Sequence, residues 1–177
     1  MIFKEKPPKF NSQLFLHSIY YYRKTLGLKL KIAAISDIVK SKYGRNSIFL
    51  NLEVMDDFPE CLNYEYDEKG IKKIDEYGNP QKKRENPQGF TVGLPFQVNV
   101  IQENKINVSE YSNLYNIIYP IAIYKGIAQR NTHYEEVTFS TGELKELLED
   151  VIFRGIVKEV RKTNYAPYLR LEVKEIL

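Results

Sequence analysis

The sequence predicts a mainly β fold with one to three helices, in which five strands form a Greek-key barrel with an insertion between the second and third strands. The first observation is that apolar and polar residues alternate in KSKYGRNSIFLNLEV (residues 40–54) and again in RKTNYAPYLRLEV (residues 161–173). Alternation with a period of two indicates half-buried strands, and each stretch contains turn-forming residues. The second observation is the order of the elements, which runs strand, strand, insertion, strand, helix, strand, strand.

Length and composition indicate one folded domain in a reducing compartment. The chain has 177 residues, of which 43% are hydrophobic, so it can bury a core. It has no run of about 18 apolar residues, and its N-terminal sequence MIFKEKPPKF has charges and prolines where a signal peptide needs an apolar stretch. The single cysteine, Cys61, excludes an internal disulfide. We therefore expect a cytoplasmic protein that does not bind membranes.

Positive charge is concentrated at the two ends of the chain, where the two hairpins are predicted. The net charge is +3. Residues 1–50 contain ten Lys or Arg and two Asp or Glu, and residues 151–177 contain six and three, whereas acids outnumber bases between them. Such segregation either builds a local field that attracts anions or reflects cationic side chains that only solvate exposed faces.

An N-terminal arm or extension, residues 1–27, precedes the predicted barrel domain at residues 28–177. Residues 12–26 of this extension fit a helix, because Ser12 can cap its start and Gly27 follows its end. Tyr and Ile also favour strands, so a strand through this segment is the alternative.

The first hairpin is predicted from Leu28 onwards. Its first strand runs to about Lys40, with a bulge or bend near residues 36–37, and its second strand covers residues 48–55. The turn between the strands, residues 42–46, contains Gly and Asn. The apolar residues of the second strand share one face: Ile48, Leu50, Leu52 and Val54.

An insertion follows at residues 56–88 and is rich in charged and turn-forming residues. We expect it to be exposed, with a hairpin at GIKKIDEYGN. A third strand is predicted at residues 90–101, and a helix then begins with Ser109 as its N-cap. Pro120 should end or kink this helix, and residues 121–125 either extend it or form a short strand.

The last part of the chain predicts a second helix and a second hairpin. Ser140 and Glu143 have the spacing of a capping box, and a stripe of leucines follows them. The last two strands cover residues 151–162 and 167–176, and a short tip at residues 163–167 joins them.

This order of elements matches a partly open barrel of the oligonucleotide/oligosaccharide-binding (OB) type. In that barrel, the loops between strands one and two and between strands four and five flank the ligand face. The chain resembles OB-fold single-stranded-DNA-binding proteins of phages and mobile elements over residues 28–56 and 96–177. Three stretches carry the resemblance: KIAAISDIVKSKYGRNSIFLNLEV, KINVSEYSNLYNII and STGELKELLEDVIFRGIVKEVRKTNYAPYLRLEVKEI. It implies a role in DNA replication or recombination, with a second copy of the chain or a replication or recombination protein as a further partner.

The two basic tips and the resemblance together predict a non-catalytic surface for single-stranded nucleic acid, with DNA expected before RNA. Cations neutralise phosphates, and aromatic rings stack on unpaired bases for roughly 1–3 kcal/mol per base. We expect no cofactor and no metal. The predicted binding residues lie on the two hairpins: Lys29, Lys31, Lys42, Tyr43, Arg45, Phe49, Asn51, Arg161, Lys162, Tyr165, Tyr168 and Arg170.

Two other functions fit parts of the same sequence. Phe49 points outward from its strand, so it is either a stacking platform or a cover for the insertion. In a protein-interaction or assembly module, Phe49, the insertion and residues 20–22 would form a partner patch. A nuclease would use Asp56, Asp57 or Glu143, but no motif places these acids together, and we expect no enzyme activity.

Overall fold

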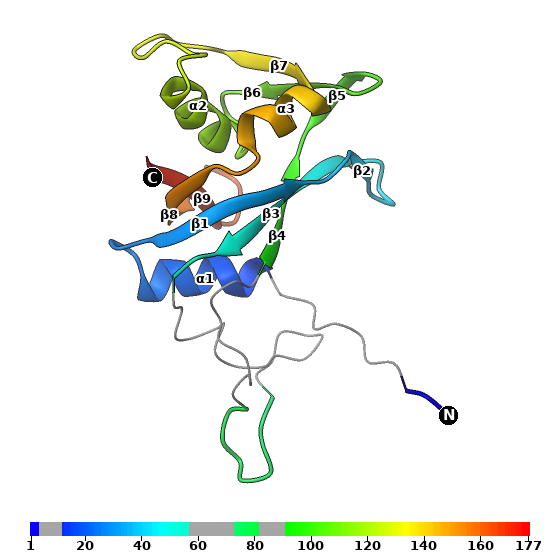
Figure 1. Ribbon diagram of the computed structural model, residues 1–177, viewed down its shortest axis with the longest axis vertical. Coiled ribbons are helices and arrows are strands. Elements are labelled where there is room, and N and C mark those ends of the chain that lie inside the picture. The colour runs from blue at the N-terminus through cyan, green and yellow to red at the C-terminus, as the bar shows by residue number, and fades with distance from the viewer. Residues whose placement is uncertain (4–11, 57–72, 82–90) are drawn as a thin grey trace.

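The computed structural model describes residues 1–3, 12–56, 73–81 and 91–177. These ranges contain three helices and nine strands, and every pair of neighbouring strands is antiparallel (Figure 1). The predicted mainly β class is therefore confirmed. In the described part of the chain, no helix has the length and apolar character needed to cross a membrane. The helices are α1 (Ser12–Tyr22), α2 (Tyr115–Tyr124) and α3 (Thr141–Leu148).

The larger sheet contains six strands, and β3 is its best-paired member. One edge of β3 pairs with β1 and then with β2, and the other edge pairs with β4. Strand β1 continues the sheet to β8, which pairs with β9. The strands are β1 (Leu28–Ile35), β2 (Val39–Lys40), β3 (Asn46–Val54), β4 (Thr91–Gln97), β8 (Ile152–Val160) and β9 (Tyr168–Ile176).

A second, three-stranded sheet lies above the larger one in Figure 1, together with α2 and α3, whereas α1 lies below. Its strands follow the order β5-β6-β7. They are β5 (Asn99–Gln102), β6 (Lys105–Ser109) and β7 (Glu136–Ser140).

The single five-stranded barrel is not confirmed, because the strands divide between two sheets. Among the described residues, β4 and β9 lie at opposite ends of the larger sheet and do not pair with each other, so the sheet stays open. Helix α1 contacts β4, β8 and β9, so it packs across the space between the two open edges.

One hydrophobic core joins the strands to the helices. The four apolar residues predicted to share a face of β3 are all fully buried. Phe15 and Ile19 of α1 and Ile117 and Ile121 of α2 are fully buried in the same cluster. The alternation in β3 therefore decides which face of the sheet is covered, because a side chain on the other face would lose this burial.

The N-terminal segment forms the helix rather than the strand. Phe15, Leu16 and Ile19 are buried at helical spacing, and this spacing gives α1 one apolar face. The predicted break in the first strand is also found, since no strand covers residues 36–38 between β1 and β2. A further irregularity in the pairing with β3 lies between Ile32 and Ala34.

The prediction that Ser109 caps a helix is wrong. Ser109 is the last residue of β6, because Ile106 and Val108 alternate, are buried and pair with β7. A turn follows, in which the Ser112 N–H donates to the Ser109 carbonyl at 3.0 Å. The helix starts only at Tyr115, and no side chain caps it.

Pro120 does not end α2, which continues to Tyr124, so residues 121–125 extend the helix rather than form a strand. Proline removes one backbone donor, but the buried residues Ile117 and Ile121 on either side hold this short helix against the core.

The predictions for the last part of the chain are confirmed. Ser140 caps α3: its hydroxyl accepts from the Glu143 N–H at 3.1 Å, and the Glu143 carboxylate accepts from the Ser140 N–H at 3.2 Å. Strands β8 and β9 form the second hairpin.

In the insertion, residues 73–81 form a turn closed by a bridge between Ile74 and Pro80. Residues 57–72 and 82–88 of the insertion, which include Asp57 and Cys61, lie outside the described residues.

Candidate nucleic-acid interface

The turn between β2 and β3 displays an aromatic ring beside a positive charge. Lys40 pairs with Asn46 at the base of the turn, and Gly44 adopts a φ of 80°, a conformation that glycine reaches without strain. The Tyr43 side chain is 80% exposed, and the Lys42 ammonium lies 5.1 Å from the centroid of its ring. The ring therefore has an open face and a cation held close to it.

The cations of this turn are not neutralised by neighbouring acids. Lys40, Lys42 and Arg45 are exposed and have no carboxylate partner among the described residues. Asp37, which precedes the turn, pairs with Lys145 at 3.1 Å. Exposed cations without partners can contact a phosphate without first losing an ion pair.

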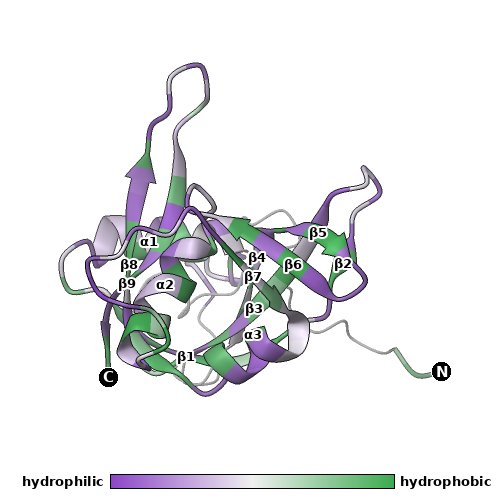
Figure 2. Ribbon diagram, turned by 90° about the horizontal axis from the view of Figure 1, so that it is seen from above, coloured by the Kyte–Doolittle hydropathy of each residue, from purple (hydrophilic) through white to green (hydrophobic). Residues whose placement is uncertain are grey.

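The tip between β8 and β9 repeats this arrangement with fewer free charges. Figure 2 shows this hairpin extending beyond the rest of the molecule. Tyr165 is 75% exposed at the tip, and the Lys162 ammonium lies 6.0 Å from the centroid of the Tyr168 ring. Arg161, however, pairs with Glu159 at 3.1 Å, so Lys162 is the cation of this tip that has no carboxylate partner in the described chain.

Arg170 forms an ion pair within its own strand. Its guanidinium donates two hydrogen bonds to Glu172, one of them from Nε at 3.0 Å, and Lys158 approaches the same carboxylate at 3.1 Å. Burial alone would raise the pKa of Glu172, but the hydrogen bonds and charges of Arg170 and Lys158 outweigh burial and lower it. Glu172 is therefore ionised and neutralises part of the charge predicted for ligand binding.

The two strand lysines differ in their contacts within the protein. Lys31 approaches Asp150 at 3.8 Å. Lys29 is half-buried, and its backbone N–H donates to Asp56 at 2.9 Å. Asp56 in turn lies 3.6 Å from Arg154. The ion pair favours a structural role for the Lys31 side chain, whereas the contact of Lys29 involves only its backbone, so the role of its ammonium stays a prediction.

Phe49 and Asn51 lie on the outward face of β3, next to β4. A Cβ atom built on Gly93 would lie 3.9 Å from the Phe49 ring and 3.2 Å from the Asn51 amide oxygen, so both side chains lean over this glycine. Phe49 is half-buried and directly opposite Pro95. Whether the insertion covers its ring stays a prediction, because residues 57–72 and 82–90 lie outside the described chain.

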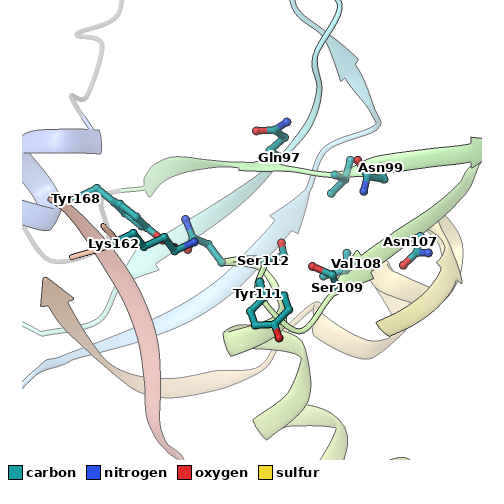
Figure 3. A pocket seen from close by; sticks show the side chains of 11 residues that line it. Gln97, Asn99, Asn107, Val108, Ser109, Tyr111, Ser112, Lys162 and Tyr168 are labelled. Atoms are coloured by element: carbon teal, nitrogen blue, oxygen red, sulfur yellow. The ribbon is translucent and has the colours of Figure 1, made fainter. Parts of the chain in front are cut away.

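A hollow of about 300 Å³ lies beside the β8–β9 tip and brings three distant segments together (Figure 3). One wall is the junction of β4 and β5, a second is β6 with the loop that follows it, and the third is the β8–β9 tip. The lining residues are Gln97, Val98, Asn99, Asn107, Val108, Ser109, Tyr111, Ser112, Asn113, Lys162 and Tyr168.

The hollow is connected by backbone pairing to the first basic turn. Ser47 pairs with Gln97, and the Val98 N–H donates to the Asn46 carbonyl at 3.0 Å. The base of the β2–β3 turn is thus one strand away from the hollow. Of the twelve predicted binding residues, Lys162 and Tyr168 line the hollow, whereas Tyr43 and its neighbours do not.

The amides and serine hydroxyls of this hollow are not among the residues predicted from the sequence. Gln97 and Asn99 stand at the end of an alternating strand, where a polar residue is expected to face solvent. Ser109 was predicted as a helix cap, and Asn107 lies just before that predicted start. The available signal was the alternation of Ile106 and Val108, which places the polar residues between and after them on the opposite face of a strand.

The acids considered for a nuclease do not meet in the described chain. Asp56 contacts Lys29 and Arg154, and Glu143 completes the capping box of α3. Asp57 lies outside the described residues. The described residues contain no group of three His, Cys, Asp or Glu side chains that could hold a metal ion. His133 pairs with Glu110 at 3.1 Å.

Comparison of the chain with protein families, with curated proteins and with solved structures finds no match in any of the three.

Proposed function

We propose that this protein binds single-stranded nucleic acid, with single-stranded DNA as the expected ligand, and that it acts by charge and stacking without catalysis. The observation that carries the proposal is an exposed tyrosine beside a cation without a carboxylate partner at each of two hairpin tips. The Lys42 ammonium lies over the Tyr43 ring, and the Tyr165 N–H donates to the Lys162 carbonyl at 3.2 Å. A sequence-tolerant binder needs cations for phosphates and ring faces for bases. Both tips offer these groups to solvent.

The strand order supports an OB-type version of this proposal. If the broken pair β1 and β2 is counted as one strand, then β3, β4, β8 and β9 become strands two to five. The two tyrosine tips are then the loops between strands one and two and between strands four and five, which flank the ligand face in OB folds. The three-stranded sheet and α1 are additions to that plan.

The proposal is tested by fluorescence anisotropy with a labelled oligo-dT over a series of salt concentrations. We expect the logarithm of the binding constant to fall linearly with the logarithm of the salt concentration, because phosphate neutralisation releases counterions. Tyr43→Ala and Tyr165→Ala should each weaken binding about fivefold or more, since each removes one stacking platform.

Tyr124→Ala is the matched control, because Tyr124 is an exposed tyrosine at the end of α2, away from both tips. Its removal should leave the affinity unchanged. An absence of binding to oligo-dT and to oligo-U at low salt would exclude the proposal.

A second candidate function is a protein-interaction or assembly module, and one observation favours it. Tyr21, Tyr22 and Leu26 are exposed at and just beyond the end of α1. Exposed aromatic residues that cluster are typical of partner surfaces. In this case light scattering coupled to size exclusion would show self-association, which Tyr21→Ser with Tyr22→Ser should abolish, and oligonucleotide binding would be absent.

A further inference from the structure

We propose that the hollow beside the β8–β9 tip holds one unpaired base of the bound strand and recognises its edge through Gln97 and Asn99. This inference rests on the proposed function and adds to it a sequence preference. The cations of the two tips contact phosphates and their rings stack on any base, so the tips do not distinguish one base from another. The hollow supplies hydrogen bonds, which differ between bases.

The chemistry of the lining favours a base over a phosphate. Four of the lining side chains are amides, two are serines and two are tyrosines, whereas Lys162 is the only cation and no carboxylate is present among them. A phosphate site would need several cations or backbone donors. Amides present a donor and an acceptor side by side, as the hydrogen-bonding edges of unpaired bases do.

The size of the hollow suits a ligand of this kind. About 300 Å³ is at the lower end of the roughly 300–1,000 Å³ of small-molecule sites. Two valines, Val98 and Val108, supply the apolar part of the lining. A single planar, polar heterocycle fits this volume and this balance better than a large apolar ligand.

Gln97 and Asn99 are the amides that are available to a ligand. Asn107 donates to Glu136 at 3.0 Å, and Asn113 accepts from the Tyr168 hydroxyl at 3.3 Å. Within the described chain, the side chains of Gln97 and Asn99 have no hydrogen-bond partner, and both are exposed. Figure 3 shows that both side chains come from one stretch of chain, the junction of β4 and β5.

Two tyrosines provide ring surfaces at the hollow. Tyr111 is 77% exposed, so its ring has a face open to a ligand. The Tyr168 ring is half-buried, and its hydroxyl is fixed by the bond to Asn113. A ring that is already held in place loses little conformational freedom when a base stacks on it.

The test compares homopolymers of equal length, dA, dC and dT, by anisotropy at one fixed salt concentration. We expect the protein to prefer one of them by about tenfold, which lies within the discrimination of one bidentate amide contact. The double variant Gln97→Ala with Asn99→Ala should bring the three affinities within about twofold of one another and leave the salt dependence unchanged, because phosphate contacts carry no sequence information.

Gln102→Ala is the matched control, because Gln102 is an exposed amide on β5 that does not line the hollow. A second measurement places single abasic sites along the preferred oligonucleotide. An abasic site at one position should lower the affinity of the protein more than an abasic site elsewhere. This difference between positions should vanish in the double variant.

The outcomes separate the two proposals. Equal affinities for the three homopolymers, or a preference that survives in the double variant, would overturn the assignment of the hollow while nucleic-acid binding stands. A failure to bind any of the oligonucleotides would overturn both.

Discussion

Glu172 shows how a single residue limits which of the predicted cations can reach a ligand. Its carboxylate accepts from Arg170 and lies 3.1 Å from Lys158, and its side chain is only 16% exposed. Arg170 and Glu172 are two residues apart on one strand, so their side chains share a face. That pairing can be predicted from spacing alone, whereas the ion pair of Lys31 with Asp150 requires the fold.

We predict that Glu172→Gln destabilises the protein by about 1–3 kcal/mol near neutral pH, because it leaves the half-buried Arg170 without its ionised partner. The folded-state pKa of Glu172 lies below its ordinary value of 4.5, so the ion pair contributes fully to the free energy of unfolding above about pH 4.5. It is lost as the pH falls through the folded-state pKa. Urea unfolding over an acid pH series should therefore show the stability difference between wild type and variant shrinking with decreasing pH.

Glu175→Gln is the control for this measurement. Glu175 lies on the same strand, but its side chain is 58% exposed, and its contact with Arg154 is 3.6 Å long. Exposed ion pairs contribute little to stability, so we expect Glu175→Gln to change the free energy of unfolding by no more than about 0.5 kcal/mol. A stability difference for Glu172→Gln that does not depend on pH would contradict the assigned ion pair.

At the scale of the elements, Gly27 determines how α1 is joined to the sheet. The chain passes from α1 to β1 at this residue with a φ of 69°. A Cβ at this position would lie 2.5 Å from the Gly155 carbonyl oxygen, which belongs to β8. The glycine therefore allows both the backbone conformation and the close approach of the connection to the strand.

We predict that Gly27→Ala lowers the free energy of unfolding by about 2 kcal/mol or more, as measured by urea denaturation. Gly126→Ala separates the two causes, because Gly126 has a φ of 74° but no atom within 4 Å of its added Cβ. Gly126→Ala should lower the free energy of unfolding by about 1 kcal/mol, because only its backbone conformation is unfavourable for alanine. If both variants lost the same free energy of unfolding, the close approach of residue 27 to β8 would not add to the cost of Gly27→Ala.

The elements that could be predicted are those whose pattern and partner are both local. The alternation in β3 and the short connection from β8 to β9 define hairpins within one stretch of sequence. The small sheet was predicted only in part. Strand β5 overlaps the third strand predicted at residues 90–101, whereas β6 and β7 were not predicted, because each has five residues and they pair with each other only across α2. Short apolar runs give the same signal as a helix start, so tertiary pairing decides the outcome.

The candidate site divides in the same way between local and distant residues. Each tip is a run of neighbouring residues, so its tyrosine and cations could be predicted together from the sequence. The hollow joins Gln97, Asn107 and Tyr168, which come together only when both sheets and the β8–β9 hairpin are in place. No spacing in the sequence relates these segments.

At the scale of the whole molecule, the described residues place cations without a carboxylate partner at both tips. Lys42 and Arg45 lie at the first tip, and Lys162 lies at the second. Other predicted cations are paired with acids: Lys31 and Arg170 on the strands, and Arg161 at the second tip. A strand that contacts both tips gains affinity because the second contact is intramolecular, whereas a short strand contacts one tip at a time.

We therefore predict that affinity for oligo-dT rises with length over about 4–16 nucleotides, the range of site sizes of OB folds, and then levels off. Changing Lys42 and Arg45 to Ala, or Lys162 to Ala, should flatten this rise and affect the long ligands most, because each change removes one of the two contacts. Arg130→Ala, an exposed cation in the loop between α2 and β7, removes charge without touching either tip and should preserve the rise. If the tip variants weakened short and long ligands by the same factor, the two tips would not act on one strand, and binding would have to be assigned to a single surface.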